Sequence, residues 1–188
     1  PYRISTMTCI FNLNELIDIK HIYDNLDSKF NTKNDTAFEI SGCIFGSNPI
    51  KGYVPKSRKP TKCKINFYNQ LTLSIKLYEN KYVKAKLFIN GKVQMTGVPD
   101  FKTREICIHT IYKLVQSLSP EKKYSCSDIK TVLINSDFDM GCNVNREALH
   151  DILLINYNIA VSYESETYPG VKVKFFWNIN HEEQDGVC

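Results

Sequence analysis

The stretch KLFINGKVQMTGV, residues 86–98, contains two runs of alternating residues separated by Asn90 and Gly91. Asn-Gly between alternating runs is the strongest short-range signal for a β-hairpin. One face of this hairpin would carry Phe88, lysines and Thr96, whereas a hairpin buried on both faces would carry only apolar residues there. We therefore predict a sheet with one open face, and this face is the candidate binding surface.

The segments around this hairpin complete a pattern of strands and helices. Residues 71–97 form three period-2 segments, which break at Glu79-Asn80 and at Asn90-Gly91. A long amphipathic helix is predicted from Asp100 or Thr103, as the N-cap, to the residues before Pro120. Upstream, residues 4–13 alternate as a strand, and residues 14–26 have helical spacing behind Asn14 as the predicted N-cap.

The strand and helix at the N-terminus recur later in the chain. Shifting residues 7–26 forward by 127 positions pairs Phe11 with Phe138 and Leu26 with Leu153. The second copy is again a strand and a helix, with Asn145 as the predicted cap, and then a strand pair around the Pro169-Gly170 turn. We interpret this as an internal duplication; coincidence between two amphipathic segments is the alternative.

Composition and cysteine spacing restrict the class of protein. The chain has 188 residues and is 43% hydrophobic, but no run approaches the ~18 apolar residues that cross a bilayer. The N-terminus lacks the pattern of a signal peptide. Seven scattered cysteines form no CxxC pair, so they resemble neither a disulfide framework nor a zinc ribbon. We expect a globular protein of an intracellular, reducing compartment, with most cysteines buried and no contact with membranes.

Two features concern the ends and the charge of the chain. The sequence starts at Pro1 without methionine and stops at Cys188, and we interpret it as part of a longer chain; whether Cys188 belongs to a metal site is open.

The net charge is +4. A proline-broken basic loop without acidic residues would either neutralise phosphates or remain a solvated loop; it contains Lys56, Arg58, Lys59, Lys62 and Lys64.

Sequence motifs of catalysis are absent. The sequence has no glycine-rich phosphate loop, no HExxH, no GxSxG and no acidic cluster at metal-ligand spacing. Cys107 and His109 are two apart on the predicted helix, where side chains diverge. We predict neither an enzyme nor a cofactor or metal site.

Three motifs resemble those of the TATA-box-binding protein (TBP) family. LFINGKVQMTGV, residues 87–98, is similar to that family's hallmark, an aliphatic-Ile-Phe stretch followed by Ser-Gly-Lys, a short strand and Thr-Gly-Ala. SYESETYPGVKVKF, residues 162–175, resembles its Ser-Tyr-Glu-Pro-Glu-x-Phe-Pro-Gly-Leu segment, and ISTMTCIFNL, residues 4–13, resembles its first strand. The resemblance covers residues 3–30 and 67–177 and is greatest to the divergent TBP-like proteins of large DNA viruses.

This resemblance implies an α+β fold, a saddle of antiparallel β-sheet with helices on the convex face and two pseudo-repeats. The first repeat would occupy residues 1–120, with a basic insertion at about 31–66. The second repeat would occupy residues 121–188 and would be truncated.

The resemblance also implies which residues contact DNA. Phe88 corresponds to an intercalating phenylalanine and Thr96 to a threonine that contacts the minor groove, with Gln94 beside it. Phe88 and Gln94 share a face only if the hairpin contains one residue more than a two-residue Asn-Gly loop allows. Lys86 and Lys92 would flank this face, either contacting DNA or as ordinary solvated charges. Phe88 would otherwise pack beneath a neighbouring element.

Several positions depart from the family pattern. In an ungapped comparison with the family, the second intercalating phenylalanine of the first repeat corresponds to Leu71. A short shift of the comparison would place Phe67 at that position instead. Tyr168 stands where the family has phenylalanine before Pro-Gly, either as a groove contact or as an aromatic residue that packs in the turn.

The two asparagines with which the family reads the groove fall on Thr6 and Leu133. Thr8 and Asn135 are two residues further along the same strands and therefore lie on the same faces. The side chain of Leu133 cannot form a hydrogen bond, and the minor groove mainly distinguishes A·T from G·C pairs. We therefore expect binding that either prefers A·T-rich DNA or is nonspecific.

The function that the resemblance implies is that of a general transcription factor. It would bind A·T-rich duplex DNA through the minor groove and help assemble an initiation complex with a TFIIB-like factor and RNA polymerase. It would act in the nucleus or in a cytoplasmic viral factory, or be packaged in the virion. Two alternatives remain: an eroded scaffold that binds transcription proteins without sequence-specific DNA recognition, and an RNA-binding sheet with stacking aromatics.

Overall fold

The structure is a computed structural model that describes residues 2–26, 38–55, 68–78 and 81–174. It divides into two compact units, Pro1–Phe138 and Asp139–Cys188. The first contains a seven-stranded sheet and the second a two-stranded sheet. The basic loop from Lys56 to Lys64 lies outside the described residues, as do Phe67 and Cys188.

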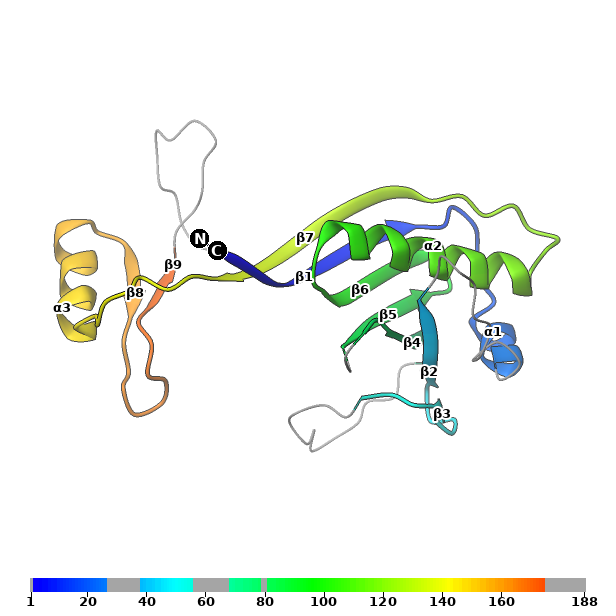
Figure 1. Ribbon diagram of the computed structural model, residues 1–188, viewed down its shortest axis with the longest axis horizontal. Helices are drawn as coiled ribbons and strands as arrows, with labels where there is room; N and C mark the ends of the chain where they lie inside the picture. Colours follow the sequence, from blue (N-terminus) through cyan, green and yellow to red (C-terminus); the bar gives the residue numbers. More distant parts are fainter. Residues whose placement is uncertain (1, 27–37, 56–67, 79–80, 175–188) are drawn as a thin grey trace. The chain divides into compact units, whose positions relative to one another are not determined.

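The sheet of the first unit is antiparallel throughout, with the strand order β3-β2-β4-β5-β6-β1-β7 (Figure 1). The three alternating segments of residues 71–97 form its centre, which confirms the prediction for them. The strands are β1 (Arg3–Asn12), β2 (Glu39–Phe45), β3 (Lys51–Gly52), β4 (Gln70–Lys76), β5 (Tyr82–Phe88), β6 (Lys92–Val98) and β7 (Ser127–Asp137).

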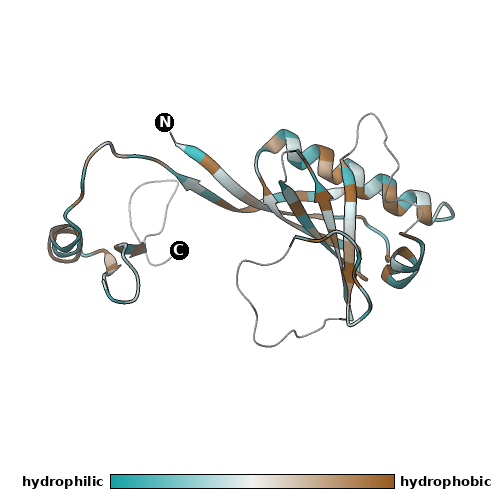
Figure 2. Cartoon of the chain, turned by 60° about the horizontal axis from the view of Figure 1, so that its bottom comes forward, coloured by the Kyte–Doolittle hydropathy of each residue, from teal (hydrophilic) through white to brown (hydrophobic). Residues whose placement is uncertain are grey.

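The hydrophobic core lies between one face of this sheet and two helices, α1 (Ile19–Asn25) and α2 (Phe101–Leu118). Leu73, Ala85 and Met95 from the central strands are fully buried, as are Ile111 and Val115 from α2. The residues that alternate with them remain partly exposed, except Ser74, which is buried. Hydrophilic and hydrophobic positions accordingly alternate along the strands in Figure 2. We call the side of the sheet opposite α1 and α2 the open face.

Helix α2 starts where the sequence predicts. The carboxylate of Asp100 accepts hydrogen bonds from the backbone N–H of Thr103, at 2.7 Å, and from the Thr103 hydroxyl, at 3.0 Å. Asp100 therefore satisfies a backbone donor at the end of the helix that has no partner within the helix.

The predicted start of the first helix is wrong. Helix α1 begins at Ile19, and Asp18, not Asn14, is its N-cap, accepting from the N–H of His21 at 2.9 Å. Asn14 has a left-handed backbone, with φ of 59°, and its side chain bonds the hydroxyls of Ser125 and Ser127. Asn14 thus joins two distant segments of the chain instead of starting a helix.

The range assigned to a basic insertion, 31–66, also needs correction. Strand β2 and the short strand β3 both lie within it, and β2 pairs with β4 along most of its length. This part of the chain therefore contributes two strands to the sheet. Strand β2 was not predictable from the sequence pattern because its Ser-Gly-Cys centre interrupts the apolar alternation.

The second unit contains helix α3 (Arg146–Asp151), a short π-helix η2 (Ile152–Asn156) and the strands β8 (Ala160–Ser162) and β9 (Lys172–Lys174). Asn145 caps α3 by accepting from the N–H of Ala148 at 3.1 Å, as predicted. The two strands pair on either side of a loop that contains Pro169-Gly170, which confirms the predicted strand pair.

None of the helices in the described ranges has both the length and the apolar character needed to span a bilayer.

Candidate nucleic-acid interface

Strands β5 and β6 bring the predicted contact residues onto the open face. Lys86 lies opposite Gln94 and Lys84 lies opposite Thr96 in the antiparallel ladder. Because side chains alternate between faces along a strand, Phe88 shares the open face with Lys84 and Lys86. The buried alternates of β5 point toward the helices instead.

The turn between β5 and β6 explains how Phe88 reaches this face. Leu87 pairs with Val93, so three residues, Ile89 to Gly91, form the loop. The N–H of Gly91 donates to the carbonyl oxygen of Phe88 at 3.0 Å, and Gly91 has a left-handed φ of 84°. This loop, with its left-handed glycine, is one residue longer than a two-residue Asn-Gly loop. The extra residue lies in the turn, and it places Phe88 on the same face as Gln94.

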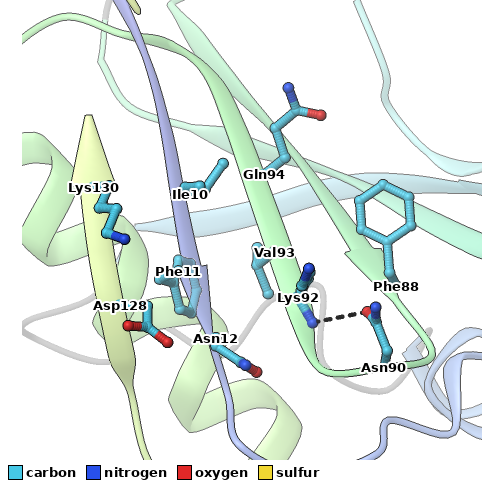
Figure 3. Close-up of a pocket in the computed structure, with 10 residues that line it drawn as sticks. All are labelled: Ile10, Phe11, Asn12, Phe88, Asn90, Lys92, Val93, Gln94, Asp128 and Lys130. Carbon is cyan, nitrogen blue, oxygen red and sulfur yellow. Dashed lines mark hydrogen bonds between the residues drawn. The ribbon is translucent and has the colours of Figure 1, made fainter. Parts of the chain in front are cut away.

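Phe88 lies at the rim of a shallow hollow of about 540 Å³ on the first unit. The ring is half-buried and does not belong to the core between sheet and helices. Figure 3 shows the hollow, in which the Asn90 side chain accepts a hydrogen bond from the N–H of Lys92 at 3.2 Å. Its lining consists of Ile10, Phe11, Asn12, Phe88, Asn90, Lys92, Val93, Gln94, Asp128 and Lys130.

Strands β1 and β7 place four further candidate positions on the open face. Thr6 pairs with Asn135 and Thr8 pairs with Leu133. The side-chain amide of Asn135 donates to the Thr6 hydroxyl at 3.0 Å, so these two polar groups bind one another. Leu133 is 48% exposed and offers this part of the face an apolar contact.

The assignment of Leu71 to the DNA contacts is wrong. Leu71 has no exposed surface and pairs with Leu87 in the ladder, on the core side of the sheet. Gln70 is the residue opposite Phe88. Because side chains alternate along a strand, an error of one position in ungapped counting moves a residue to the other face.

Tyr168 belongs to the second unit, in the loop between β8 and β9. The ring is 50% exposed, packs close to Gly170 and lies beneath the Nζ of Lys172, which is 5.1 Å from the ring centroid. The predicted contact residues that the structure places together on the open face all belong to the first unit. A role of Tyr168 in the same surface stays a prediction.

Cationic side chains are concentrated near Phe88 and Gln94. Lys84, Lys86 and Lys92 alternate with apolar residues along β5 and β6, and Lys130 lines the hollow together with Asp128. Within the described ranges, no salt bridge neutralises these lysines. They are therefore available to an anionic ligand.

The described residues contain no group of three or more His, Cys, Asp and Glu that could hold a metal ion. The pKa of the Cys107 thiol is raised to about 12, mainly by burial and to a smaller extent by neighbouring Cys9 and Asp100. A thiol that stays protonated is a poor nucleophile.

Three residues of the open face were not among the predicted contacts. Ile10 lies opposite Gln94, and Tyr82 is the first residue of β5, on the same face as Lys84. Both could have been found by extending the alternation to the ends of their strands. Tyr53 gave no such signal, because it follows the two-residue strand β3 in a range assigned to an insertion.

Comparisons with known proteins agree with the motifs and the fold. No family model matches the sequence. The chain is 29% identical, over an alignment of 175 residues, to a "TATA-box-binding protein-like" protein of Acanthamoeba polyphaga mimivirus. The alignment covers 80% of this chain and 45% of that protein, so the chain spans less than half the length of this relative.

A solved structure, "Methanococcus jannaschii TBP", matches with a TM-score of 0.55 and 19% identity, over 90% of this chain and 74% of that one. The antiparallel sheet with helices on one face is thus that of a TBP-like α+β saddle. The predicted resemblance is confirmed: the chain has the fold of the TATA-box-binding proteins and is similar in sequence to a viral TBP-like protein.

Proposed function

We propose that this chain is a TBP-like transcription factor that binds duplex DNA from the minor-groove side through its open face. The observation that carries the proposal is the position of Phe88. It lies on the face opposite the helices, beside Gln94 and above a hollow, rather than in the core.

A half-buried phenylalanine at the end of a central strand, on the open face, suits one kind of DNA contact. Proteins that bind the minor groove, the TATA-box-binding proteins among them, insert apolar side chains between base steps and kink the duplex. The unstacking costs a few kcal/mol, which the additional contacts of the bent duplex offset. Phe88 is the side chain on β5 that can make this insertion, since Val83, Ala85 and Leu87 are buried in the core.

The polar groups of the open face suit base edges in the minor groove. Gln94, Thr96 and Thr8 lie side by side across β6 and β1, and amide or hydroxyl groups can donate to the acceptors that A·T pairs present there. Leu133 cannot donate, and Asn135 already donates to Thr6. The chain should therefore prefer A·T-rich DNA without strictly selecting one promoter sequence.

The lysines of this face would supply the electrostatic part of the affinity. Lys84, Lys86 and Lys92 can each neutralise a phosphate, and each neutralised phosphate lowers the slope of log K against log salt by about 0.9. We include the basic loop, Lys56 to Lys64, as further phosphate contacts or as a docking patch for RNA polymerase and a TFIIB-like factor. Assembly of an initiation complex, in a nucleus or a cytoplasmic viral factory, would follow from these contacts.

A protein-binding scaffold is the second candidate. The exposed apolar side chain of Leu133 favours it, because it occupies a groove-reading position with a group suited to a protein partner. The scaffold would bind transcription proteins through the sheet or the helices and would not recognise duplex DNA.

Salt-titrated binding to short A·T-rich duplexes tests the proposal. The chain should bind and bend the duplex, as detected by fluorescence, and its affinity should fall with salt. The Phe88→Ala variant should lose roughly 10- to 100-fold in affinity together with the bend. Phe101→Ala is the matched control, since Phe101 is a 50% exposed phenylalanine at the start of α2.

Three results would contradict duplex DNA binding by the open face. Affinity no greater than that of a peptide carrying residues 51–64 would favour the scaffold. Equal losses in Phe88→Ala and Phe101→Ala would show that the open face is not the site. Competition by single-stranded RNA at lower concentration than by duplex DNA would favour the RNA-binding alternative.

A further inference from the structure

Residues 49–53, which we call the strap, pass around the outer edge of the seven-stranded sheet. On the helix side, the Tyr23 hydroxyl donates to the carbonyl oxygen of Pro49 at 2.7 Å. The Nζ of Lys51 donates to the carbonyl oxygens of Tyr23, at 2.7 Å, and Asp24, at 3.2 Å, near the end of α1. The strap, which contains the edge strand β3, is thus fixed to the first helix.

The other end of the strap lies on the open face. The N–H of Tyr53 donates to the carbonyl oxygen of Ser41 at 2.7 Å, and the Ser41 hydroxyl lies within hydrogen-bond distance of the Tyr53 carbonyl oxygen and of the Ser74 hydroxyl, at 3.0 Å each. Ser74 pairs with Lys84 on the open face, yet none of its surface is exposed. The strap therefore covers this part of the face.

Two glycines allow the strap to approach the sheet this closely. A Cβ atom on Gly42 would lie 2.6 to 2.7 Å from backbone atoms of Tyr53 and Lys51. A Cβ atom on Gly52 would lie 2.3 Å from the carbonyl oxygen of Ser41, and Gly52 has a left-handed φ of 65°. Any larger residue at either position would push the strap away, so the sequence is built for this contact.

The strap ends by holding an aromatic ring above the open face. The ring of Tyr53 lies 5.5 Å from that of Tyr82, centroid to centroid, at an angle of 49°. Tyr53 is nevertheless 59% exposed. A strap that served only to bury surface would bury its largest side chain, whereas this one covers two serine hydroxyls and leaves its ring accessible. The ring is pre-positioned, which lowers the entropic cost of binding a ligand.

We propose that Tyr53 and Tyr82 form a second contact site for duplex DNA, an inference that rests on the proposed function. The two rings pack against deoxyribose groups of one strand, and Lys84, two residues from Tyr82 on the same face, binds an adjacent phosphate. Contacts to sugars and phosphates do not depend on which bases the strand carries. This site adds affinity and fixes where the DNA lies, without reading bases.

The spacing along β5 suits a duplex that contacts both sites. Tyr82 and Phe88 are the first and last residues of this strand, and at ~3.3 Å per residue they are ~20 Å apart. That distance equals about six steps of B-DNA at 3.4 Å per base pair. One duplex on the open face can therefore meet the phenylalanine at one end of β5 and the tyrosine pair at the other.

Hydroxyl-radical footprinting of the full chain on an A·T-rich duplex tests this site, because the radicals attack deoxyribose. In Tyr53→Ala and Tyr82→Ala, protection should be lost from the sugars at one end of the footprint. Affinity should fall by roughly 5- to 100-fold, as for loss of one aromatic stack, while the bend that depends on Phe88 persists. Tyr53→Phe keeps the ring and should keep the protection.

Tyr78→Ala is the matched control, since Tyr78 is a 46% exposed tyrosine just beyond the end of β4. Circular dichroism of each variant checks that the sheet remains folded. An unchanged footprint and affinity in a variant that combines Tyr53→Ala with Tyr82→Ala, with Phe88→Ala still deficient, would overturn the tyrosine site and leave the proposed function standing. A longer footprint without the tyrosines would also overturn it, because the strap would then be blocking DNA. A wild-type chain without any protection would overturn both proposals.

Discussion

Leu71 and Phe88 lie on adjacent strands but on opposite faces of the sheet. Leu71 pairs with Leu87 and is fully buried, whereas Phe88 pairs with Gln70 and is half-buried on the open face. We expect Leu71→Ala to lower the free energy of unfolding by about 2–5 kcal/mol, because it leaves a cavity in a packed core. Denaturant unfolding followed by circular dichroism measures this change.

Phe88→Ala serves as the comparison for that experiment. Because the ring lies outside the core, we expect a change in unfolding free energy well below that of Leu71→Ala, of the order of 1 kcal/mol or less. A Phe88→Ala variant that is as unstable as Leu71→Ala would mean that the ring packs inside the protein. The open face would then lose its principal contact residue.

At the scale of elements, the cap of α2 shows how a side chain fixes a helix start. Asp100 accepts two hydrogen bonds from Thr103, and its carboxylate lies at the N-terminus, where the helix dipole favours negative charge. Asp100→Ala should lower the unfolding free energy by about 0.5–2 kcal/mol. Asp100→Asn, which can still accept from the backbone, should restore most of it. Equal losses in the two variants would show that the charge, and not the hydrogen bond, stabilises the helix.

The elements also show what the sequence could predict and what it could not. The start of α2 depends on Asp100 and Thr103, three residues apart, so it was predictable from a local pattern. Helix α1 is capped just as locally, by Asp18 and His21, but Asn14, the other candidate for the cap, bonds instead to Ser125 and Ser127, more than a hundred residues away. No local pattern contains that information.

The candidate site divides in the same way. Phe88, Gln94 and Thr96 follow from strand alternation and from the turn glycine, all within residues 88–96. Tyr53 reaches the open face only because Gly42 and Gly52 let the strap lie close against β2. That contact depends on two strands whose pairing was not visible in the sequence.

At the scale of the whole molecule, the pairing of β1 with β7 bears on the proposed duplication. The shift of 127 positions relates Thr6 to Leu133 and Thr8 to Asn135. In the ladder, Thr6 pairs with Asn135 and Thr8 pairs with Leu133. Exchanging each residue for its repeat equivalent therefore turns one pair into the other, as expected when two related strands meet about a local twofold axis. This register supports the duplication, which stays a proposal.

The distribution of the core predicts how the chain unfolds. The buried core residues of the described chain all lie between Met7 and Tyr124, and β7, which ends at Asp137, pairs with β1 inside the first unit. A fragment of residues 1–138 should therefore unfold in a single cooperative transition. It should have a denaturant midpoint close to that of the first unit in the 188-residue chain.

Hydrogen exchange provides the second measurement for this prediction. Backbone amides of β4, β5, β6 and α2 should exchange slowest in both the fragment and the 188-residue chain, since they surround the buried side chains. Amides of η2, which has no buried residue, should exchange faster. A fragment that loses its cooperative transition, or whose β5 amides become unprotected, would show that residues 139–188 contribute to the core. The open face would then require both units to form, and the tests of Phe88 and Tyr53 would have to use the longer chain.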